Sequence, residues 1–236
     1  MVKKIFKIIL RIFLVLSIIV GVFIGFNFYQ YQQIKKEKPL EPLVNTLRNN
    51  PDFLTIDEIS QEFLDALVAT EDRRFYSRKG FDFKALARSI LVNIEQGKLV
   101  QGGSTIPQQV GKLLYFDHDQ DLNEKVIQVF IMYDLESLYS KDEILELYVN
   151  SIYFGSGYTG IKQAAEGYFN TSAKDLDWSQ ATLLAGIIPA PSVYDPRLNM
   201  KLAKERQYAV LLSLQSTKKL TKAQADEIYK QEVIIY

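Results

Sequence analysis

Two neighbouring carboxylates, Glu71 and Asp72, lie in the arginine-rich segment ATEDRRFYSRKGFD. A carboxylate at the end of an apolar helix can face a cleft and act as a general base, which contributes roughly 10² to 10⁴ in rate when geometry and pKa suit. The same pair also fits a solvated charge cluster that follows a helix. The pair alone therefore indicates a candidate base without establishing one.

The segment QGGSTIPQQVGKLLYF, residues 101 to 116, holds a second set of polar side chains next to two glycines. Glycine permits close backbone approach, a serine or threonine can cap a helix, and proline suits the first helical turn. The free N–H groups of such a terminus form a natural anion site. A diphosphate or a sugar fits this segment, and a simple capped helix with a polar surface fits it equally well. The candidate ligands are Ser104, Thr105, Gln108, Gln109 and Lys112.

Composition argues against several other kinds of site. The chain has 236 residues, no cysteine and a single histidine, His118, which has no serine or metal-ligand partner at a known spacing. We interpret His118 as a surface residue. Residues 1 to 40 hold seven basic residues against one acidic residue, which leaves 21 basic against 27 acidic in the remainder of a chain with zero net charge. A body with an acidic excess has no general footprint for nucleic acid, so a local cluster of cations must hold any anionic ligand.

The body that must position these residues reads as a succession of helices, so the expected fold class is mainly α. Thr55 and Glu58 form a capping box at the start of the first helix, and Asp82 can cap the second. The second helix carries an apolar stripe from Phe83 to Ile94, which we assign to the core. Helices are expected at about 56–70, 83–96, 106–115, 122–139, 141–149, 160–168, 178–188, 197–215 and 222–231. Loops on a rigid scaffold usually carry binding and catalysis, and the three polar, glycine-containing loops are 73–80, 98–105 and 155–160.

An uncharged apolar run from Ile12 to Tyr29 precedes this body. A helix rising roughly 1.5 Å per residue needs about this length to cross most of a hydrocarbon core about 30 Å thick. Basic residues precede the run, so the positive-inside rule places the N-terminus in the cytoplasm and the body outside. A cleaved signal peptide is the alternative, but the run is longer than usual and no A-x-A site follows. We divide the chain into a cytoplasmic basic end (1–11), a single transmembrane anchor (12–31), a linker (32–51) and an extracytoplasmic domain (52–236).

Four segments, in order, resemble the motifs of the bacterial peptidoglycan glycosyltransferase family. They are ATEDRRFYSRKGFD, QGGSTIPQQVGK, KDEILELYVNSIYFGSGYTGIKQAAEGYF and ATLLAGIIPAPSVYDP. The resemblance covers about residues 45 to 215, and because no transpeptidase domain follows, the chain is similar to the monofunctional transglycosylases. It implies a mainly α, lysozyme-like fold with a larger head and a smaller, membrane-proximal apolar jaw that rests in the outer leaflet.

The resemblance also implies a reaction. The 4-hydroxyl of an acceptor lipid II would attack the anomeric carbon of a donor glycan linked to undecaprenyl diphosphate, with inversion. Glu71 would be the base, Asp72 and Arg73 would line the cleft, and Lys112 would neutralise the leaving diphosphate. Family members commonly use a divalent cation such as magnesium there, which nothing in this sequence alone predicts. Other cell-wall synthesis proteins are candidate partners. The remaining matches to the second motif are Ser104, Thr105, Gln108 and Gln109.

The third motif departs from the family pattern Arg-Lys-x-x-Glu. Counting back from Tyr139 places Glu124, Lys125 and Gln128 at its charged positions. Glu124 would repel a diphosphate that the family's arginine attracts, and Gln128 hydrogen-bonds but does not serve as a carboxylate base or hold a cation as firmly. Arg78, which stands where a histidine is usual, is a candidate to supply the lost positive charge.

Three functions are open at this point. The first is an active glycosyltransferase that tolerates the changed third motif, supported by Glu71, Lys112 and Lys125. The second is a catalytically weak paralogue that binds lipid II or a wall-synthesis partner as a scaffold, motivated by Glu124 and Gln128. The third is a membrane-anchored muramidase, suggested only by the lysozyme-like fold and ranked last.

Overall fold

The computed structural model of the chain describes residues 2–97, 103–116 and 121–236. Within these residues the structure is helical apart from short turns and one isolated bridge between Tyr153 and Thr159, so the predicted class, mainly α, is confirmed. His118 and residues 98–102 of the second expected loop lie outside the described residues. The elements are α1 (Val2–Glu37), α2 (Leu40–Arg48), the 3₁₀ turn η1 (Ile56–Glu58), α3 (Gln61–Glu71), α4 (Phe83–Gln96), α5 (Ile106–Tyr115), α6 (Leu122–Leu138), α7 (Lys141–Ser151), α8 (Ile161–Phe169), α9 (Trp178–Ile187), α10 (Pro191–Tyr194), α11 (Pro196–Ser216) and α12 (Lys222–Lys230).

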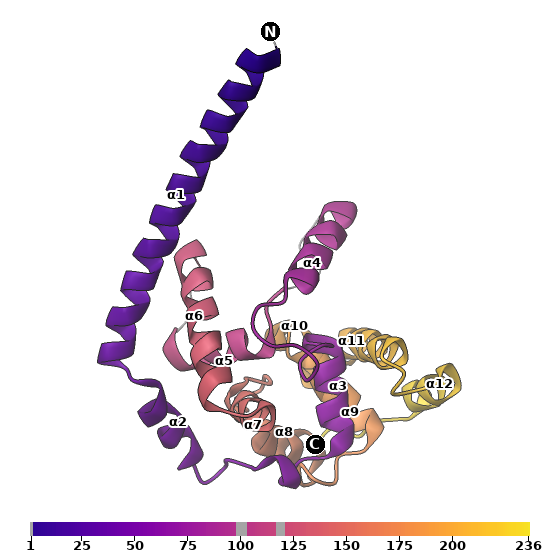
Figure 1. Ribbon diagram of the computed structural model, residues 1–236. Helices are drawn as coiled ribbons and strands as arrows, with labels where there is room; N and C mark the ends of the chain where they lie inside the picture. The colour runs from indigo at the N-terminus through magenta and orange to yellow at the C-terminus, as the bar shows by residue number, and fades with distance from the viewer. Residues whose placement is uncertain (1, 98–102, 117–120) are drawn as a thin grey trace.

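The N-terminal helix α1 is long and apolar enough to cross a membrane by length and composition. It departs from the body as a single long rod (Figure 1). Its C-terminal end packs on α6, where the rings of Tyr31 and Phe130 lie 5.5 Å apart. Asp134 of α6 accepts a hydrogen bond from Tyr31 and forms an ion pair with Lys35 at 2.7 Å. The C-terminal end of α1 is therefore fixed to the helix that carries the third motif.

The stretch expected as a linker, residues 32–51, contains the last turns of α1 and the whole of α2. Leu40 and Val44 are buried where α2 packs on α7. The expected helix start at residue 56 is wrong, because the capping box of Thr55 and Glu58 closes only the short turn η1. Ser60 caps α3 instead, its hydroxyl accepting from the backbone N–H of the third following residue. A capping box is satisfied within one turn, so it does not require a long helix after it.

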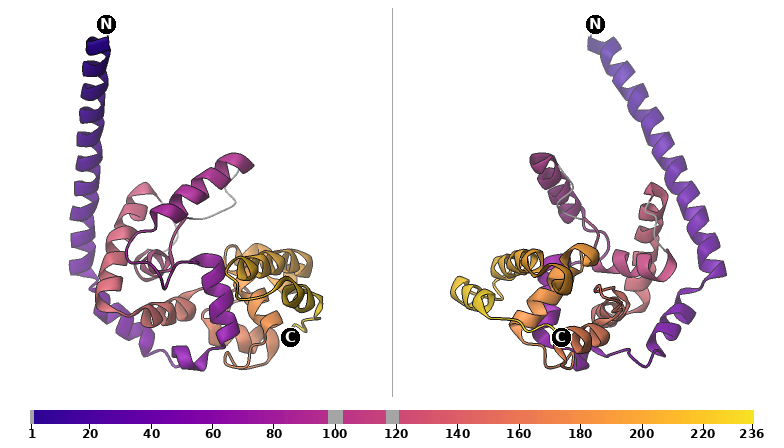
Figure 2. Two further views of the ribbon diagram at one scale, coloured as in Figure 1. Left: turned by 45° about the vertical axis from the view of Figure 1, so that its right-hand side comes forward. Right: turned by 180° about the vertical axis from the view of Figure 1, so that it is seen from behind.

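Two buried clusters hold the body together. Helices α3, α9 and α11 form one packed layer, and α5, α6 and α7 form another (Figures 1 and 2). Gly186 of α9 allows close approach, since a Cβ there would lie 3.2 Å from the backbone of Arg206 on α11. Gly111 of α5 has the same role against Ile131 of α6, at 3.0 Å. The end of α3, the first turns of α5 and the middle of α11 meet at the candidate base, Glu71.

Helix α4 contradicts the core assignment of its apolar stripe. It projects from the body on the same side as α1 (Figures 1 and 2). Phe83, Leu91 and Ile94 are 73%, 62% and 72% exposed. Helical periodicity reports that one face is apolar, but it does not say whether protein or lipid covers that face.

Candidate functional site

The C-terminal end of α3 delivers Glu71 to the side of α5. The amide nitrogen of Gln109 donates to Glu71 Oε2 at 2.8 Å, and the amide oxygen of Gln109 accepts from the hydroxyl of buried Tyr148 at 2.8 Å. A tyrosine hydroxyl on the amide oxygen leaves the nitrogen for the carboxylate. The candidate base is therefore held in one orientation by a residue of the second motif and a residue of α7.

Burial raises the pKa of Glu71 above its usual range. The hydrogen bond from Gln109 and the charge of Arg206 oppose the rise, and the charge of Asp72 adds to it. A carboxyl with a raised pKa is suited to take a proton near neutral pH. No motif or spacing indicated Arg206, which lies 135 positions further along the chain on α11 and stacks on the ring of Tyr194 at 5.3 Å.

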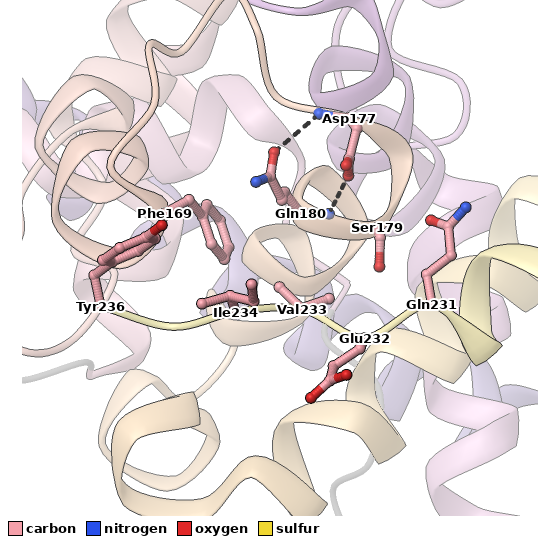
Figure 3. A pocket seen from close by; sticks show the side chains of 9 residues that line it. All are labelled: Phe169, Asp177, Ser179, Gln180, Gln231, Glu232, Val233, Ile234 and Tyr236. Atoms are coloured by element: carbon pink, nitrogen blue, oxygen red, sulfur yellow. Dashed lines mark hydrogen bonds between the residues drawn. The ribbon is translucent and has the colours of Figure 1, made fainter.

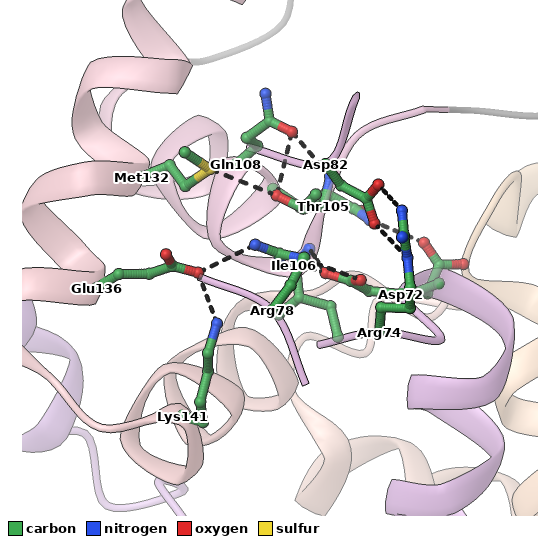
Figure 4. Close-up of polar contacts among 12 residues, drawn as sticks. Asp72, Arg74, Arg78, Asp82, Thr105, Ile106, Gln108, Met132, Glu136 and Lys141 are labelled. Atoms are coloured by element: carbon green, nitrogen blue, oxygen red, sulfur yellow. Dashed lines mark hydrogen bonds and ion pairs between the residues drawn. The ribbon is translucent and has the colours of Figure 1, made fainter. Parts of the chain in front are cut away.

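Asp72 joins the end of α3 to the start of α5. Its side chain is 3% exposed and accepts from the backbone N–H of Ile106 at 3.2 Å. Arg78 donates to the same carboxylate oxygen at 2.5 Å (Figure 4). A carboxylate at a helix N-terminus gains from the helix dipole as well as from the hydrogen bond. This geometry favours a positioning role for Asp72, behind Glu71.

The guanidinium of Arg78 lies between two carboxylates. Its side chain is 8% exposed, and it donates to Glu136 at 3.1 Å on the side away from Asp72 (Figure 4). Lys141 also binds Glu136, at 2.6 Å. Position 124 is twelve residues from Glu136 on the same helix, a distance of roughly 18 Å at about 1.5 Å per residue. Arg78 therefore does not supply the positive charge missing at position 124, because its charge is balanced where it stands.

Two residues of the second motif serve the start of α5 itself. Thr105 and Gln108 form a capping box and are both buried, and the amide oxygen of Gln108 accepts from the backbone N–H of Thr105 at 2.9 Å. The Thr105 hydroxyl also lies 3.8 Å from the sulfur of Met132 (Figure 4). These contacts account for both side chains as structural groups. Their expected role in substrate binding stays a prediction.

The remaining polar residues gather between α5 and the first turns of α6. We call Ser104, Lys112, Glu124, Lys125 and Gln128 the lysine cluster. The ammonium group of Lys125 donates to the hydroxyl of Ser104 at 3.3 Å and to the amide oxygen of Gln128 at 3.2 Å. Burial lowers the pKa of Lys125, the nearby charge of Lys112 lowers it further, and Glu124 opposes the change. With two lysines against one carboxylate, the lysine cluster carries a net positive charge.

Arg73 and the loop 155–160 make hydrogen bonds to residues outside the lysine cluster. Arg73 is exposed and donates to the hydroxyl of Ser216 at the end of α11, at 3.4 Å. In the loop 155–160, Ser156 donates to Asp195 at 2.7 Å and Tyr158 accepts from Arg197 at 2.9 Å. The expected part of Arg73 in the cleft stays a prediction.

A cavity of about 470 Å³ lies elsewhere, between the C-terminal segment and α9 (Figure 3). Its lining includes Asp177 and Gln180, whose side chains are occupied in the capping box of α9. Neither Glu71 nor any member of the lysine cluster lines it. The cavity therefore adds no group to the candidate site.

Comparisons with known proteins give the family of the chain. A family model described as Transglycosylase matches residues 37–215. Penicillin-binding protein 2D of Bacillus subtilis is 40% identical over 179 residues, which are 76% of this chain and 26% of the relative. Penicillin-binding protein 1F of the same organism is 42% identical over 162 residues, 69% of this chain and 23% of the relative. Penicillin-binding protein 1A of Neisseria flavescens is 38% identical over 182 residues, 77% of this chain and 23% of the relative.

A crystal structure of penicillin-binding protein 1A from Haemophilus influenzae aligns with a TM-score of 0.48 and 22% identity, covering 78% of this chain and 18% of that one. The chain spans about a quarter of the length of the relatives named above. The family model covers most of the chain, and the site residues Glu71 to Gln128 all lie inside the match. The chain belongs to the transglycosylase family.

Proposed function

We propose that the chain is a peptidoglycan glycosyltransferase that polymerises lipid II into glycan strands. The observation that carries this proposal is the carboxyl of Glu71, which has a raised pKa and is oriented by Gln109 at 2.8 Å. Lys112 lies about one turn beyond Gln109 on α5, so the residue that orients the candidate base and a candidate anion ligand share one helix. Membership of the transglycosylase family supports the same reaction.

In this reaction Glu71 takes the proton of the acceptor 4-hydroxyl as that oxygen attacks the anomeric carbon of the donor. The bond from that carbon to the diphosphate oxygen breaks, the configuration inverts, and undecaprenyl diphosphate leaves with the electron pair. Gln109 favours the ionised form of the base, since it donates to the carboxylate. Lys112 and Lys125 neutralise the negative charge that develops on the leaving group.

The substrate is lipid-linked, which fits the two apolar surfaces of the chain. Helix α1 anchors the chain with its N-terminus in the cytoplasm, and the domain from residue 52 onward works outside. The exposed apolar residues of α4 rest in the outer leaflet, as the membrane-proximal jaw. A lipid-linked donor would then approach the domain from the membrane that α1 and α4 enter.

Polymerisation of fluorescent lipid II by the full-length protein in detergent tests the proposal. Glycan chains from the wild type and their loss in Glu71→Gln support it. Synthesis only by the double variant Glu124→Arg with Gln128→Glu contradicts it and favours a lipid II-binding scaffold. Release of soluble fragments from mature peptidoglycan would point to a muramidase instead.

A further inference from the structure

The open hydrogen-bonding positions of the lysine cluster are mostly donors. The amide oxygen of Gln128 accepts from Lys125 at 3.2 Å, which leaves its Nε2 group to donate to another acceptor. Gln128 is 1% exposed, and within the part of the chain that the structure describes its Nε2 atom has no hydrogen-bond partner. An unpartnered buried amide donor costs free energy that a bound acceptor would recover. This donor stands beside an ammonium group, which calls for the same kind of ligand.

A divalent cation does not fit these residues. Mg²⁺ and similar hard cations take oxygen ligands, with carboxylates as the principal protein donors. Across residues 2–97, 103–116 and 121–236, the described side chains form no group of three or more His, Cys, Asp or Glu placed to hold a metal. The cluster offers one carboxylate, Glu124, and the amide oxygen of Gln128 is already taken by Lys125. A cation would also meet the charges of Lys112 and Lys125.

An anion with several oxygens fits the same positions. A diphosphate accepts hydrogen bonds from lysine ammonium groups and from an amide N–H, and charge-assisted bonds of this kind are the stronger ones. Burial lowers the pKa of Lys125 most, and repulsion from Lys112 lowers it further. A bound anion relieves that repulsion, whereas a cation would add to it. One carboxylate oxygen of Glu124 is buried without a hydrogen-bond partner among the described residues, and its negative charge opposes a bound anion.

We propose that the lysine cluster holds the diphosphate of its substrate through Lys112, Lys125 and the amide of Gln128 alone, without a divalent cation. The inference rests on the proposed function for the identity of the substrate. The binding chemistry does not depend on turnover, so it can be tested separately. The family's carboxylate at position 128 has become an amide, and this is the change that removes the second oxygen ligand.

Binding of inorganic pyrophosphate to the full-length protein in detergent, in the presence of EDTA, is the first test. We expect pyrophosphate to raise the Tm, and the rise to disappear in Lys125→Met but not in Lys222→Met, an exposed lysine on α12. Absence of a Tm rise in EDTA, or a rise that requires added Mg²⁺, overturns the inference. Binding that survives equally in Lys125→Met overturns it too.

Binding of Mn²⁺ measured by electron paramagnetic resonance is the second test, with Gln128→Glu as the matched variant. We expect Gln128→Glu to bind Mn²⁺ at least about tenfold more tightly than the wild type, because it restores a second carboxylate. Measurable binding of Mn²⁺ by the wild type, with an affinity equal to that of Gln128→Glu, overturns the inference.

The polymerisation assay in EDTA and in Mg²⁺ then separates the inference from the proposed function. We expect the wild-type rates to agree within about twofold, and a drop of about tenfold in EDTA overturns the inference. Glycan synthesis in neither condition counts against the proposed function, and the two binding measurements then decide the inference alone.

Discussion

The amide of Gln109 donates to the carboxylate of Glu71 at 2.8 Å, and this contact orients the candidate base. The hydroxyl of Tyr148 fixes the other end of the amide at 2.8 Å. A single neutral donor thus stabilises the ionised form of Glu71 against the cost of burial, which is the largest influence on its pKa. The pH dependence of the proposed reaction should therefore depend on the opposing effects of burial and of the Gln109 hydrogen bond on the pKa of Glu71.

Replacing Gln109 by Met is expected to shift the acid limb of the pH profile to higher pH. The hydrogen bond lowers the pKa of Glu71, so its removal raises that pKa further. The base acts in its ionised form, and the activity at neutral pH therefore falls. Polymerisation rates measured from about pH 5 to pH 9 would show the shift. An acid limb at the wild-type position, with only a lower plateau, would contradict this account.

Glu71→Gln is expected to lose roughly 10² to 10⁴ in rate while gaining stability at alkaline pH. Burial raises the pKa of Glu71 in the folded state, so the ionised carboxylate costs stability above that pKa. Below the unfolded value, about 4.3, both states hold the proton and the cost vanishes. The Tm of the variant should therefore be higher than that of the wild type at pH 8, and the difference in Tm should shrink toward pH 4. A variant that is less stable at pH 8 would show that the carboxylate has a structural role.

The helices that carry the site could be predicted because their start signals are local. Ser140 and Glu143 form the capping box that begins α7, and Thr105 and Gln108 form the one that begins α5. The apolar face of α4 was also readable, but its exposure was not, because periodicity carries no information on what covers a face. Capping signals thus predict where an element begins and leave its surroundings open.

Contacts between distant segments explain the other differences. The charge of Arg206 influences Glu71 because α11 packs on α3, and no spacing in the sequence indicates this approach. The same is true of Arg78, because its partner Glu136 lies 58 positions away in the sequence. A charged residue read from sequence alone has an unknown partner, and the partner decides whether its charge is free for a ligand.

Arg78→Met is expected to destabilise the protein by about 3 to 5 kcal/mol, because it leaves Asp72 and Glu136 as buried carboxylates without their shared cation. Urea unfolding with matched m-values measures the change. Lys79→Met, at the exposed neighbouring position, is the control and should stay within about 0.5 kcal/mol of the wild type. A loss of activity in Arg78→Met with unchanged stability would instead favour a direct contact with substrate.

The apolar face of α4 is expected to enter a lipid surface. The chain has no cysteine, so a single Cys at position 94 can be labelled with an environment-sensitive fluorophore. Ile94 is 72% exposed. The emission of a fluorophore on Ile94→Cys should shift to shorter wavelength when the full-length protein is moved from amphipol into liposomes. A label at Leu212 on α11, which is 46% exposed, is the control. Equal spectra at both positions would mean that α4 stays in water.

Glu124→Gln is expected to strengthen the binding of pyrophosphate. The carboxylate opposes an anion in the lysine cluster, and removing one unit charge at about 4 Å in a water-like medium is worth about 1 kcal/mol, or about fivefold in Kd. Glu124 also raises the pKa of Lys125, against burial and Lys112, which lower it. The variant therefore lowers the pKa of Lys125 further, and its advantage should be full at pH 7 and shrink as rising pH removes the proton. Calorimetric titration of pyrophosphate in EDTA, at pH 7 and at a higher pH, measures the effect. Glu227→Gln on the exposed face of α12 is the control. An affinity equal to or below that of the wild type at pH 7 would show that Glu124 does not face the bound anion.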